Sequence, residues 1–191
     1  MNKDGKILIG FDLDGVIIDH SKVKILLAKK LGFKVSKKQI PADIMIKLLP
    51  DSVYQILKYG LYDDPKTALK AELMSGFKRF LNVLIKKNIP FLAISRRKRN
   101  FEIPVQLLKK YNLWGSDLFH SRNVYFVSGP NDKNNLGIKL GVTHFIDDEP
   151  QVLEGLTAIK NKYLFDPYKS FKKSPYVKVT SWKELASKIK F

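Results

Sequence analysis

Two aspartates, Asp12 and Asp14, lie one residue apart in the segment FDLDGV at 11–16, just after the apolar run ILI at 7–9. Burying an unpaired carboxylate costs on the order of several kcal/mol, so such a pair at the end of a strand indicates a cation, a proton to be moved or a nucleophile. In an open α/β sheet, ligands bind at this end of the strands. A solvated turn is the simpler alternative, because Asp-Gly is also a common turn sequence.

Two further apolar runs end in polar side chains. The run HFI ends in Asp147 and Asp148, and the run IPFLAI ends in Ser95. A lysine, Lys133, precedes the second acidic pair on a segment with the pattern of a helix. Three strand-like runs therefore end in acid, hydroxyl and acid, which weakens the solvated-turn alternative.

The order and spacing of these residues resemble the four signature motifs of the haloacid dehalogenase (HAD) superfamily of phosphotransferases. The resemblance covers nearly the whole chain. Its most specific part is D-x-D-G after an apolar strand, and the Asp-Asp pair of the fourth motif is moderately specific, whereas one serine and one lysine are weak signals alone. More loosely, the short insertion and the tail at 163–167 and 181–182 resemble the 5′(3′)-deoxyribonucleotidase branch.

The resemblance implies a role for each motif residue. Asp12 would attack phosphorus to form an aspartyl-phosphate, and Asp14 would protonate the leaving oxygen and later activate water. The Asp12 carboxylate, the backbone carbonyl of Asp14 and Asp147 would hold Mg²⁺, a hard cation suited to oxygen ligands. Ser95 and Lys133 would bind the phosphoryl oxygens, and Lys133 would also offset the charge of the nucleophile.

Other interpretations of these positions remain open at this stage. Asp148 would support the metal shell or orient the lysine. Lys139 competes with Lys133, although the longer spacing of Lys133 from the acidic pair fits the resembled pattern better. Ser95 could merely cap the exit of its strand.

Arginines follow the serine directly, and Arg96 or Arg97 could fork onto a phosphate as a substrate-binding group. The alternative is a solvated basic turn. The three histidines show no metal-ligand spacing, so surface or packing roles are expected for His20, His120 and His144. Gly129 and Pro130 do not make a P-loop, which leaves ATP binding by that route unsupported.

The presence of Asp14 favours phosphoryl transfer over dehalogenation, because an alkoxide leaving group needs a proton and a halide does not. We therefore expect a Mg²⁺-dependent phosphomonoester hydrolase acting on a nucleotide or another small phosphorylated metabolite. A phosphomutase is one alternative. A noncatalytic protein that binds nucleic acid through a basic surface is another.

The composition is that of a globular protein without disulfides. The chain has 191 residues, 45% hydrophobic and 28% charged, and no cysteine, which fits one domain of ~100–200 residues with an insertion. No apolar segment approaches the ~18 residues of a membrane helix, and no signal peptide is recognisable, so a cytoplasmic location without a membrane partner is expected.

The net charge of +17 is unusual. It would attract polyanions such as nucleic acid. Because 30 lysines and 5 arginines are spread along the whole chain, base composition of the genome is the favoured explanation, and a polyanion partner is the alternative. The sequence does not indicate an oligomeric state.

The order of the predicted elements indicates an α/β fold, a Rossmann-like and mostly parallel sheet with helices on both faces. Residues 1–17 and 75–191 would form this HAD-like core. Residues 18–74 carry helical patterns, and in the resembled family an insertion here is a cap over the active site; the alternative is helices that pad one edge of the sheet. Cap tyrosines could stack on a base or belong to the core: Tyr54, Tyr59 and Tyr62.

Individual elements can also be predicted. Helical spacing predicts three apolar helix faces: Val23, Leu26, Leu27 and Leu31; Val53, Ile56 and Leu57; and Phe77, Phe80, Leu81 and Leu84. Core strands are expected at 6–11, 91–94, 124–127 and 163–165 and before Asp147. Helices are expected to begin at Asp64, Pro104, Asp132 and Ser181, and 166–177 is expected to be an exposed loop.

Overall fold

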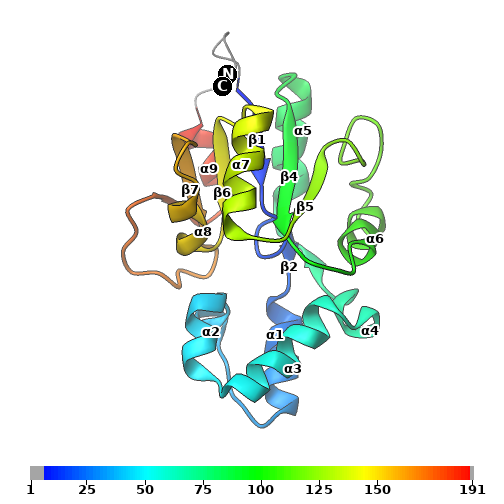
Figure 1. Ribbon diagram of the computed structural model, residues 1–191, viewed down its shortest axis with the longest axis vertical. Helices are drawn as coiled ribbons and strands as arrows, with labels where there is room; N and C mark the ends of the chain where they lie inside the picture. Colours follow the sequence, from blue (N-terminus) through cyan, green and yellow to red (C-terminus); the bar gives the residue numbers. More distant parts are fainter. Residues whose placement is uncertain (1–6, 190–191) are drawn as a thin grey trace.

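The computed structural model describes residues 7–189 and contains a six-stranded sheet in which every neighbouring pair is parallel (Figure 1). The strand order is β5-β4-β1-β6-β7-β8. The strands are β1 (Ile9–Phe11), β4 (Phe91–Arg96), β5 (Val124–Val127), β6 (His144–Asp147), β7 (Asn161–Phe165) and β8 (Val177–Val179). The predicted fold class is confirmed.

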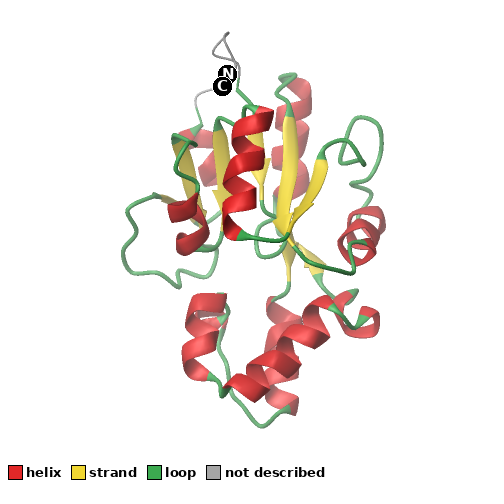
Figure 2. Cartoon of the chain, viewed as in Figure 1, coloured by secondary structure: helices red, strands yellow, loops and turns green. Residues whose placement is uncertain are grey.

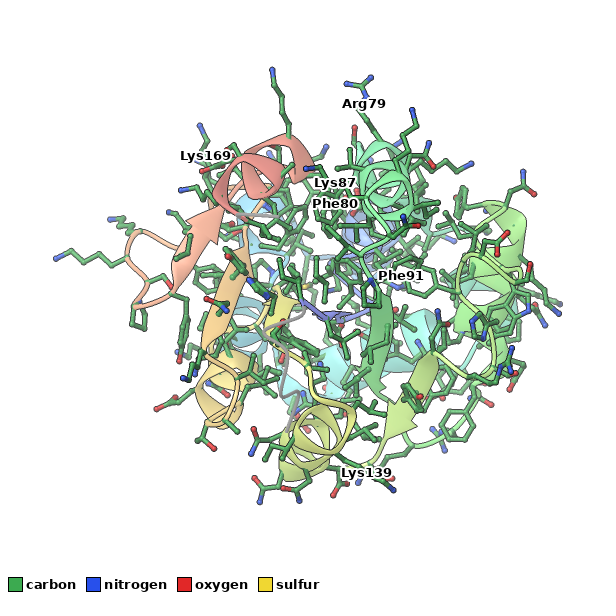
Figure 3. The ribbon with its side chains drawn as sticks, turned by 90° about the horizontal axis from the view of Figure 1, so that it is seen from above. Arg79, Phe80, Lys87, Phe91, Lys139 and Lys169 are labelled. Atoms are coloured by element: carbon green, nitrogen blue, oxygen red, sulfur yellow. The ribbon has the colours of Figure 1, made fainter. Side chains whose placement is uncertain are left out.

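Helices cover both faces of the sheet. Seen from above, α5 and α9 lie on one face, and α7 and α8 lie on the other (Figure 3). The helices of this region are α5 (Phe77–Lys86), α6 (Glu102–Lys110), α7 (Pro130–Leu140), α8 (Pro150–Gly155) and α9 (Trp182–Lys188). Helices on both faces bury the strands and explain their continuous apolar runs.

The core on the α5 and α9 face is aromatic. The ring of Phe11, from β1, lies 5.7 Å from that of Phe77 and 5.8 Å from that of Trp182, both at steep angles. The expected apolar face of α5 is buried over its whole length, at Phe77, Phe80, Leu81 and Leu84. The strand that leads to Asp12 is therefore fixed by ring packing on one side.

A second group of helices follows β1 and lies beyond the carboxyl ends of the sheet strands (Figure 2). Two short antiparallel strands, β2 (Ile18–Asp19) and β3 (Glu72–Leu73), join it to the sheet. Its helices are α1 (Ser21–Lys30), η1 (Lys37–Gln39), α2 (Ala42–Leu48), α3 (Asp51–Tyr62) and α4 (Pro65–Ala68). We call residues 18–74 the helical insertion.

Several expected boundaries agree with the structure. Asp64 caps α4 by accepting a hydrogen bond from the Lys66 amide at 3.1 Å, and the Ser181 hydroxyl accepts one from the Glu184 amide at 3.2 Å. The predicted first residue of β1, Lys6, lies outside the described residues. No helix among residues 7–189 has the length and apolar character needed to cross a bilayer.

Other expectations are wrong in detail. α6 begins at Glu102, two residues early, because the first turn of a helix tolerates a proline such as Pro104. α7 begins at Pro130, also two residues early, and Asp132 accepts a hydrogen bond from the Gly129 amide three residues before it. The loop expected at 166–177 ends in β8, whose alternating V-K-V pattern was too short to detect. In the helical insertion, Leu26 and Ile56 lie on predicted apolar faces but are exposed.

Candidate active site

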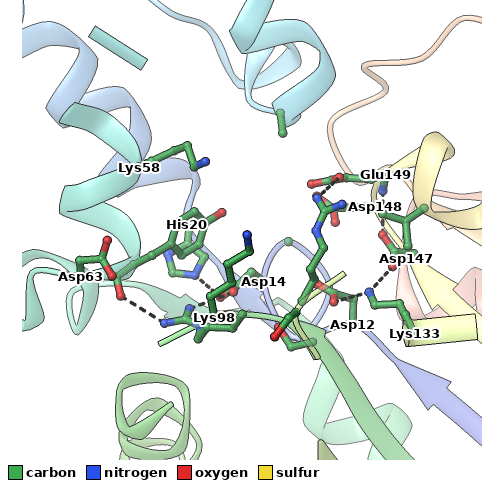
Figure 4. Close-up of a pocket in the computed structure, with 18 of the residues that line it drawn as sticks. Asp12, Asp14, His20, Lys58, Asp63, Lys98, Lys133, Asp147, Asp148 and Glu149 are labelled. Atoms are coloured by element: carbon green, nitrogen blue, oxygen red, sulfur yellow. Dashed lines mark hydrogen bonds and ion pairs between the residues drawn. The ribbon is translucent and has the colours of Figure 1, made fainter. Parts of the chain in front are cut away.

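The sheet brings the three polar strand ends together. β1 pairs with β4 on one side and with β6 on the other, so Asp12, Ser95 and Asp147 lie at one edge of the sheet. Figure 4 shows Asp12 and Asp147 there. The Asp12 amide donates to the Ile146 carbonyl at 2.9 Å and extends the pairing up to the site. All three side chains are buried.

Lys133 of α7 joins two of these acids. Its Nζ donates to Asp12 Oδ1 at 2.7 Å and to Asp147 Oδ2 at 2.9 Å. Lys139, at the other end of the same helix, is exposed and points away from the site (Figure 3). Of the two lysines considered from the sequence, the structure places Lys133 at the acids.

Burial affects Asp12 and Lys133 in different ways. The pKa of Asp12 is raised to about 7. Burial is the main cause, and together with the nearby Asp147 and Asp14 carboxylates it outweighs the attraction of Lys133 for the ionised form. Burial also disfavours charge on Lys133, yet the two carboxylates outweigh it and raise the pKa of Lys133 above its usual value. The lysine therefore stays charged beside an acid whose charge is costly.

Asp14 has different partners. His20 Nε2 lies 2.7 Å from Asp14 Oδ1, and Arg97 Nη2 donates to Asp14 Oδ2 at 3.0 Å. Burial works against ionisation, but Arg97 and His20 outweigh it and hold the pKa of Asp14 well below its usual range. Both Asp14 oxygens are engaged by these side chains, which leaves its backbone carbonyl as the group that could face a cation.

Asp148, the last acid of the predicted set, lies against the loop that follows β1. A Cβ at Gly15, which has φ +85°, would overlap the Asp148 carboxylate, so glycine permits this close approach. Burial, together with Glu149, Asp147 and Asp12, raises the pKa of Asp148 well above its usual value. Lys133 donates to Asp147 and not to Asp148 among the described contacts.

The sheet edge and the helical insertion enclose a cavity of about 460 Å³. Asp12, Asp14, Ser95 and Lys133 line it from the sheet side, and Tyr54 and Tyr62 line it from α3. A cavity of this size accommodates a small metabolite. Among the three tyrosines noted in the sequence, Tyr59 is exposed and does not line the cavity.

The two arginines after the serine point in different directions. Arg96, predicted as a substrate-binding residue, lines the cavity and lies 3.5 Å from Glu149. Arg97 is buried, donates to Asp14 and to the Tyr62 carbonyl at 3.3 Å, and lies over the Tyr62 ring. Arg97 thus connects the sheet edge with the helical insertion.

The donors at the sheet edge fit a hard divalent cation. Asp12 and Asp147 supply carboxylate oxygens, and the buried acids around them outnumber the single ammonium of Lys133. Within residues 7–189 no three acidic, histidine or cysteine side chains form a metal-binding group by themselves. A cation here would need the Asp14 carbonyl and water to complete its shell.

Sequence reasoning missed His20 beside Asp14, and it also gave no role to Lys58 and Lys98, which line the cavity. His20 was assigned a surface or packing role, but it is buried and contacts Asp14. The loop after β1 curls back, with the Gly15 amide donating to the Ile18 carbonyl at 2.8 Å, and this brings position 20 beside position 14. The only signal in the sequence is the glycine that permits the curl.

Solved structures with the same fold cover almost the entire chain. A haloacid dehalogenase-like protein from Agrobacterium tumefaciens has a TM-score of 0.60 at 16% identity, covering 96% of this chain and 97% of the other. A HAD-superfamily hydrolase from Ehrlichia chaffeensis has a TM-score of 0.59 at 15% identity, covering 94% of each chain. A HAD family hydrolase from Deinococcus radiodurans, with bound phosphate and sodium, has a TM-score of 0.61 at 15% identity, covering 94% and 93%.

No protein-family model and no curated protein sequence matches the chain. The structural matches identify the HAD-like fold that the motifs indicated. At identities of 15–16% they show the fold and do not single out the deoxyribonucleotidase branch, which therefore stays a prediction from sequence.

Proposed function

We propose that this protein is a Mg²⁺-dependent phosphomonoester hydrolase that works through an aspartyl-phosphate. The observation that carries the proposal is the environment of Asp12. It lies at the base of the cavity, held by Lys133 at 2.7 Å, with a second carboxylate two residues further on. Binding alone would not require this combination of nucleophile, ammonium, hydroxyl and second acid.

The reaction would take place in two displacements. A carboxylate oxygen of Asp12 attacks phosphorus, a new O–P bond forms, and the bond from phosphorus to the substrate oxygen breaks while Asp14 gives that oxygen a proton. For this step Asp14 must first take up a proton, which requires the bound substrate to displace Arg97 or His20 from its carboxylate. Water then attacks the aspartyl-phosphate, Asp14 takes a proton from it, and orthophosphate leaves while the Asp12 carboxylate is restored.

Other residues would neutralise and position the phosphoryl group. Ser95 would hydrogen-bond its oxygens, and Lys133 would offset the charge of both nucleophile and phosphate. Asp12, Asp147 and the Asp14 carbonyl would hold Mg²⁺, which when bound neutralises phosphoryl charge, while Asp148 supports this shell.

The helical insertion would act as the cap of the site. It forms the second wall of the cavity through Tyr54 and Tyr62, and enclosing the substrate would exclude bulk water and select the leaving group. Hydrolysis and phosphomutase activity would share the sheet-edge residues. They differ in whether orthophosphate accumulates.

Orthophosphate release from a phosphoester panel tests the proposal. The panel contains nucleoside monophosphates, sugar phosphates, p-nitrophenyl phosphate and oligonucleotides phosphorylated at the 5′ or 3′ end. We expect Mg²⁺-dependent release that Asp12→Asn abolishes, whereas Asp117→Asn, at an exposed aspartate outside the cavity, retains it. Folded wild-type protein that is inert toward the whole panel with Mg²⁺ would contradict the proposal.

The net charge of +17 supports one other candidate, a noncatalytic nucleic-acid-binding protein on the same fold. Such binding would weaken steeply with salt and would survive Asp12→Asn. Binding with this behaviour, combined with no phosphate release, would favour that candidate.

A further inference from the structure

Two basic side chains of the cavity have no acidic partner. Lys58 lies on α3 and Lys98 in the loop after β4, and their ammonium ends point toward the open space between the insertion and the sheet (Figure 4). Neither forms an ion pair within the part of the chain that the structure describes. Lys58 lies 6.0 Å from the centre of the Tyr54 ring.

The remaining basic residues around the cavity are already engaged. Four of them contact acids and one contacts a carbonyl: Arg96 with Glu149, Arg97 with Asp14, Arg99 with Asp63, Lys133 with Asp12 and Asp147, and Lys24 with the Ile40 carbonyl. The protein therefore neutralises its own charges along most of the cavity. Two cations on opposite walls are the exception.

These two cations are separated from the reacting groups. Lys133 and Asp12 lie on one side of Asp14, and Lys58 and Lys98 lie on the side of His20 (Figure 4). A phosphoryl group bound beside Asp12 and Ser95 would leave the lysine pair to the rest of the substrate. Both lysines are exposed at the rim of the cavity, so with an uncharged leaving group their ammonium ends would remain hydrated and would contribute nothing to substrate binding.

We infer that the substrate carries a second anionic group, a phosphate or a carboxylate, on its leaving-group side, and that Lys58 and Lys98 bind it. The inference rests on the proposed function. One lysine comes from the helical insertion and the other from the sheet region, so a bound anion would hold the two walls together. Ammonium groups bind phosphate and carboxylate as charge-assisted hydrogen-bond donors, and two of them acting on one anion add their attractions.

Matched substrate pairs test the inference. Fructose 1,6-bisphosphate adds a phosphate to fructose 1-phosphate, and 6-phosphogluconate provides a carboxylate that glucose 6-phosphate lacks. We expect the wild-type protein to show a kcat/KM at least about tenfold higher for the member with the second anion in one of these pairs, mainly through KM. The pair that shows the preference identifies phosphate or carboxylate.

A charge-matched control assigns the preference to the cavity. In the double variant Lys58→Gln, Lys98→Gln we expect the preference to fall about tenfold. The double variant Lys66→Gln, Lys86→Gln loses the same charge at exposed lysines outside the cavity and should keep the preference. Screening predicts that added salt reduces the wild-type preference.

Two results would overturn the inference and leave the proposed function standing. One is equal kcat/KM within both substrate pairs, and the other is an undiminished preference in the Lys58→Gln, Lys98→Gln variant. A different result separates it from the proposed function. If the wild-type protein hydrolyses no ester, p-nitrophenyl phosphate included, the proposed function fails and this inference fails with it.

Discussion

The edge of the sheet and the helical insertion differ in how completely they satisfy their own side chains. At the sheet edge, Lys133 contacts two acids and Arg97 contacts a third. In the insertion, Lys22 pairs with Glu72 at 2.7 Å, but Lys58, which lines the cavity, has no acidic partner among the described residues. Lys98, on the loop after β4, shares this lack and faces the insertion across the cavity. Among residues 7–189, eight large hydrophobic side chains are exposed, and five of them lie in the insertion: Leu26, Ile46, Leu48, Ile56 and Tyr59.

This difference separates two tasks. Groups that neutralise one another are held in fixed positions, which suits the reacting centre, where small displacements are costly. Groups without partners are available to a ligand. The sheet edge would thus determine the reaction and the insertion would determine the molecule, and substitutions in each region should have different effects.

The largest expected effect belongs to the sheet edge. Asp14→Asn should slow the first turnover of a sugar phosphate about 10³-fold, because the alkoxide leaving group receives no proton. The loss should be much smaller for p-nitrophenyl phosphate, whose leaving group is stable without one. Rapid-quench measurement of the released alcohol checks this, and an equal loss with both esters would contradict the assignment of Asp14 as the acid.

Removing the ammonium at the sheet edge should reduce stability next most strongly. Lys133→Met leaves Asp12 buried without its countercharge, so we expect the free energy of unfolding to fall by about 3 kcal/mol at pH 8. Lys139→Met changes an exposed lysine of the same helix and should cost less than about 0.5 kcal/mol.

The pH dependence of that loss follows from Asp12. In the variant, the positive charge that favours ionised Asp12 is gone, so the pKa of the buried Asp12 rises further above its usual value. A carboxyl with a raised pKa in the folded state destabilises the fold as the pH rises. The deficit should therefore be smaller at pH 5 than at pH 8. Urea unfolding at both values measures it, and a deficit that grows on acidification would contradict the ion-pair interpretation.

Arg97 belongs to both regions, and its removal should have an intermediate effect. Arg97→Met should lower the free energy of unfolding by about 2 kcal/mol at pH 7, because Asp14 loses a charged hydrogen-bond donor. Arg79→Met, at an exposed arginine on α5 (Figure 3), should have no measurable effect.

The sign of the pH dependence is again set by the acid. Arg97 holds the pKa of Asp14 below its ordinary value of 3.8, so its stabilisation is present above that pH and is lost as the pH falls further. The difference between wild type and Arg97→Met should be constant from pH 7 to about 5 and should shrink toward pH 3. Unfolding curves across this range distinguish it from a simple packing defect.

The smallest effect is expected where the insertion begins. The Tyr168 hydroxyl donates to Asp19 Oδ2 at 2.6 Å, and the Ser21 hydroxyl lies 3.0 Å from the Tyr168 oxygen, where it can donate to it, so the loop after β7 is joined to the start of α1. Tyr168→Phe should cost about 1 kcal/mol in urea unfolding. Tyr125→Phe, which removes an exposed hydroxyl that donates to the Arg122 carbonyl, should cost less. Equal losses of unfolding free energy in the two variants would show that the Tyr168 hydrogen bonds stabilise the fold no more than an exposed one does.

The sequence predicted the sheet well because its strands are apolar runs that end in polar residues. Asp12, Ser95 and Asp147 could each be placed at a strand end, and parallel pairing then put them at one edge. The apolar face of α5 was also visible, because its spacing matches a helix that packs against a broad surface.

The insertion was harder to predict for physical reasons. β2 and β3 have two residues each, too few to show a period. Helical spacing shows that Leu26 shares a face with Val23. It does not show whether the neighbouring helices of a small insertion are large enough to cover the whole face, and in the structure Val23 is buried while Leu26 is exposed. His20 depends on a loop curl, which leaves no pattern beyond Gly15.

The position of β1 also has a consequence for how the chain is made. β1 pairs with residues 91–93 of β4 and 144–146 of β6, so the strand that leads to Asp12 gains neither neighbour until much of the chain has left the ribosome. The helices of the insertion contact one another, α1 against α3 and α3 against α4, and such local contacts form early. Asp12, the proposed nucleophile, is thus the first residue of the proposed site to be synthesised, and its strand can enter the sheet only after β4 and β6 have followed.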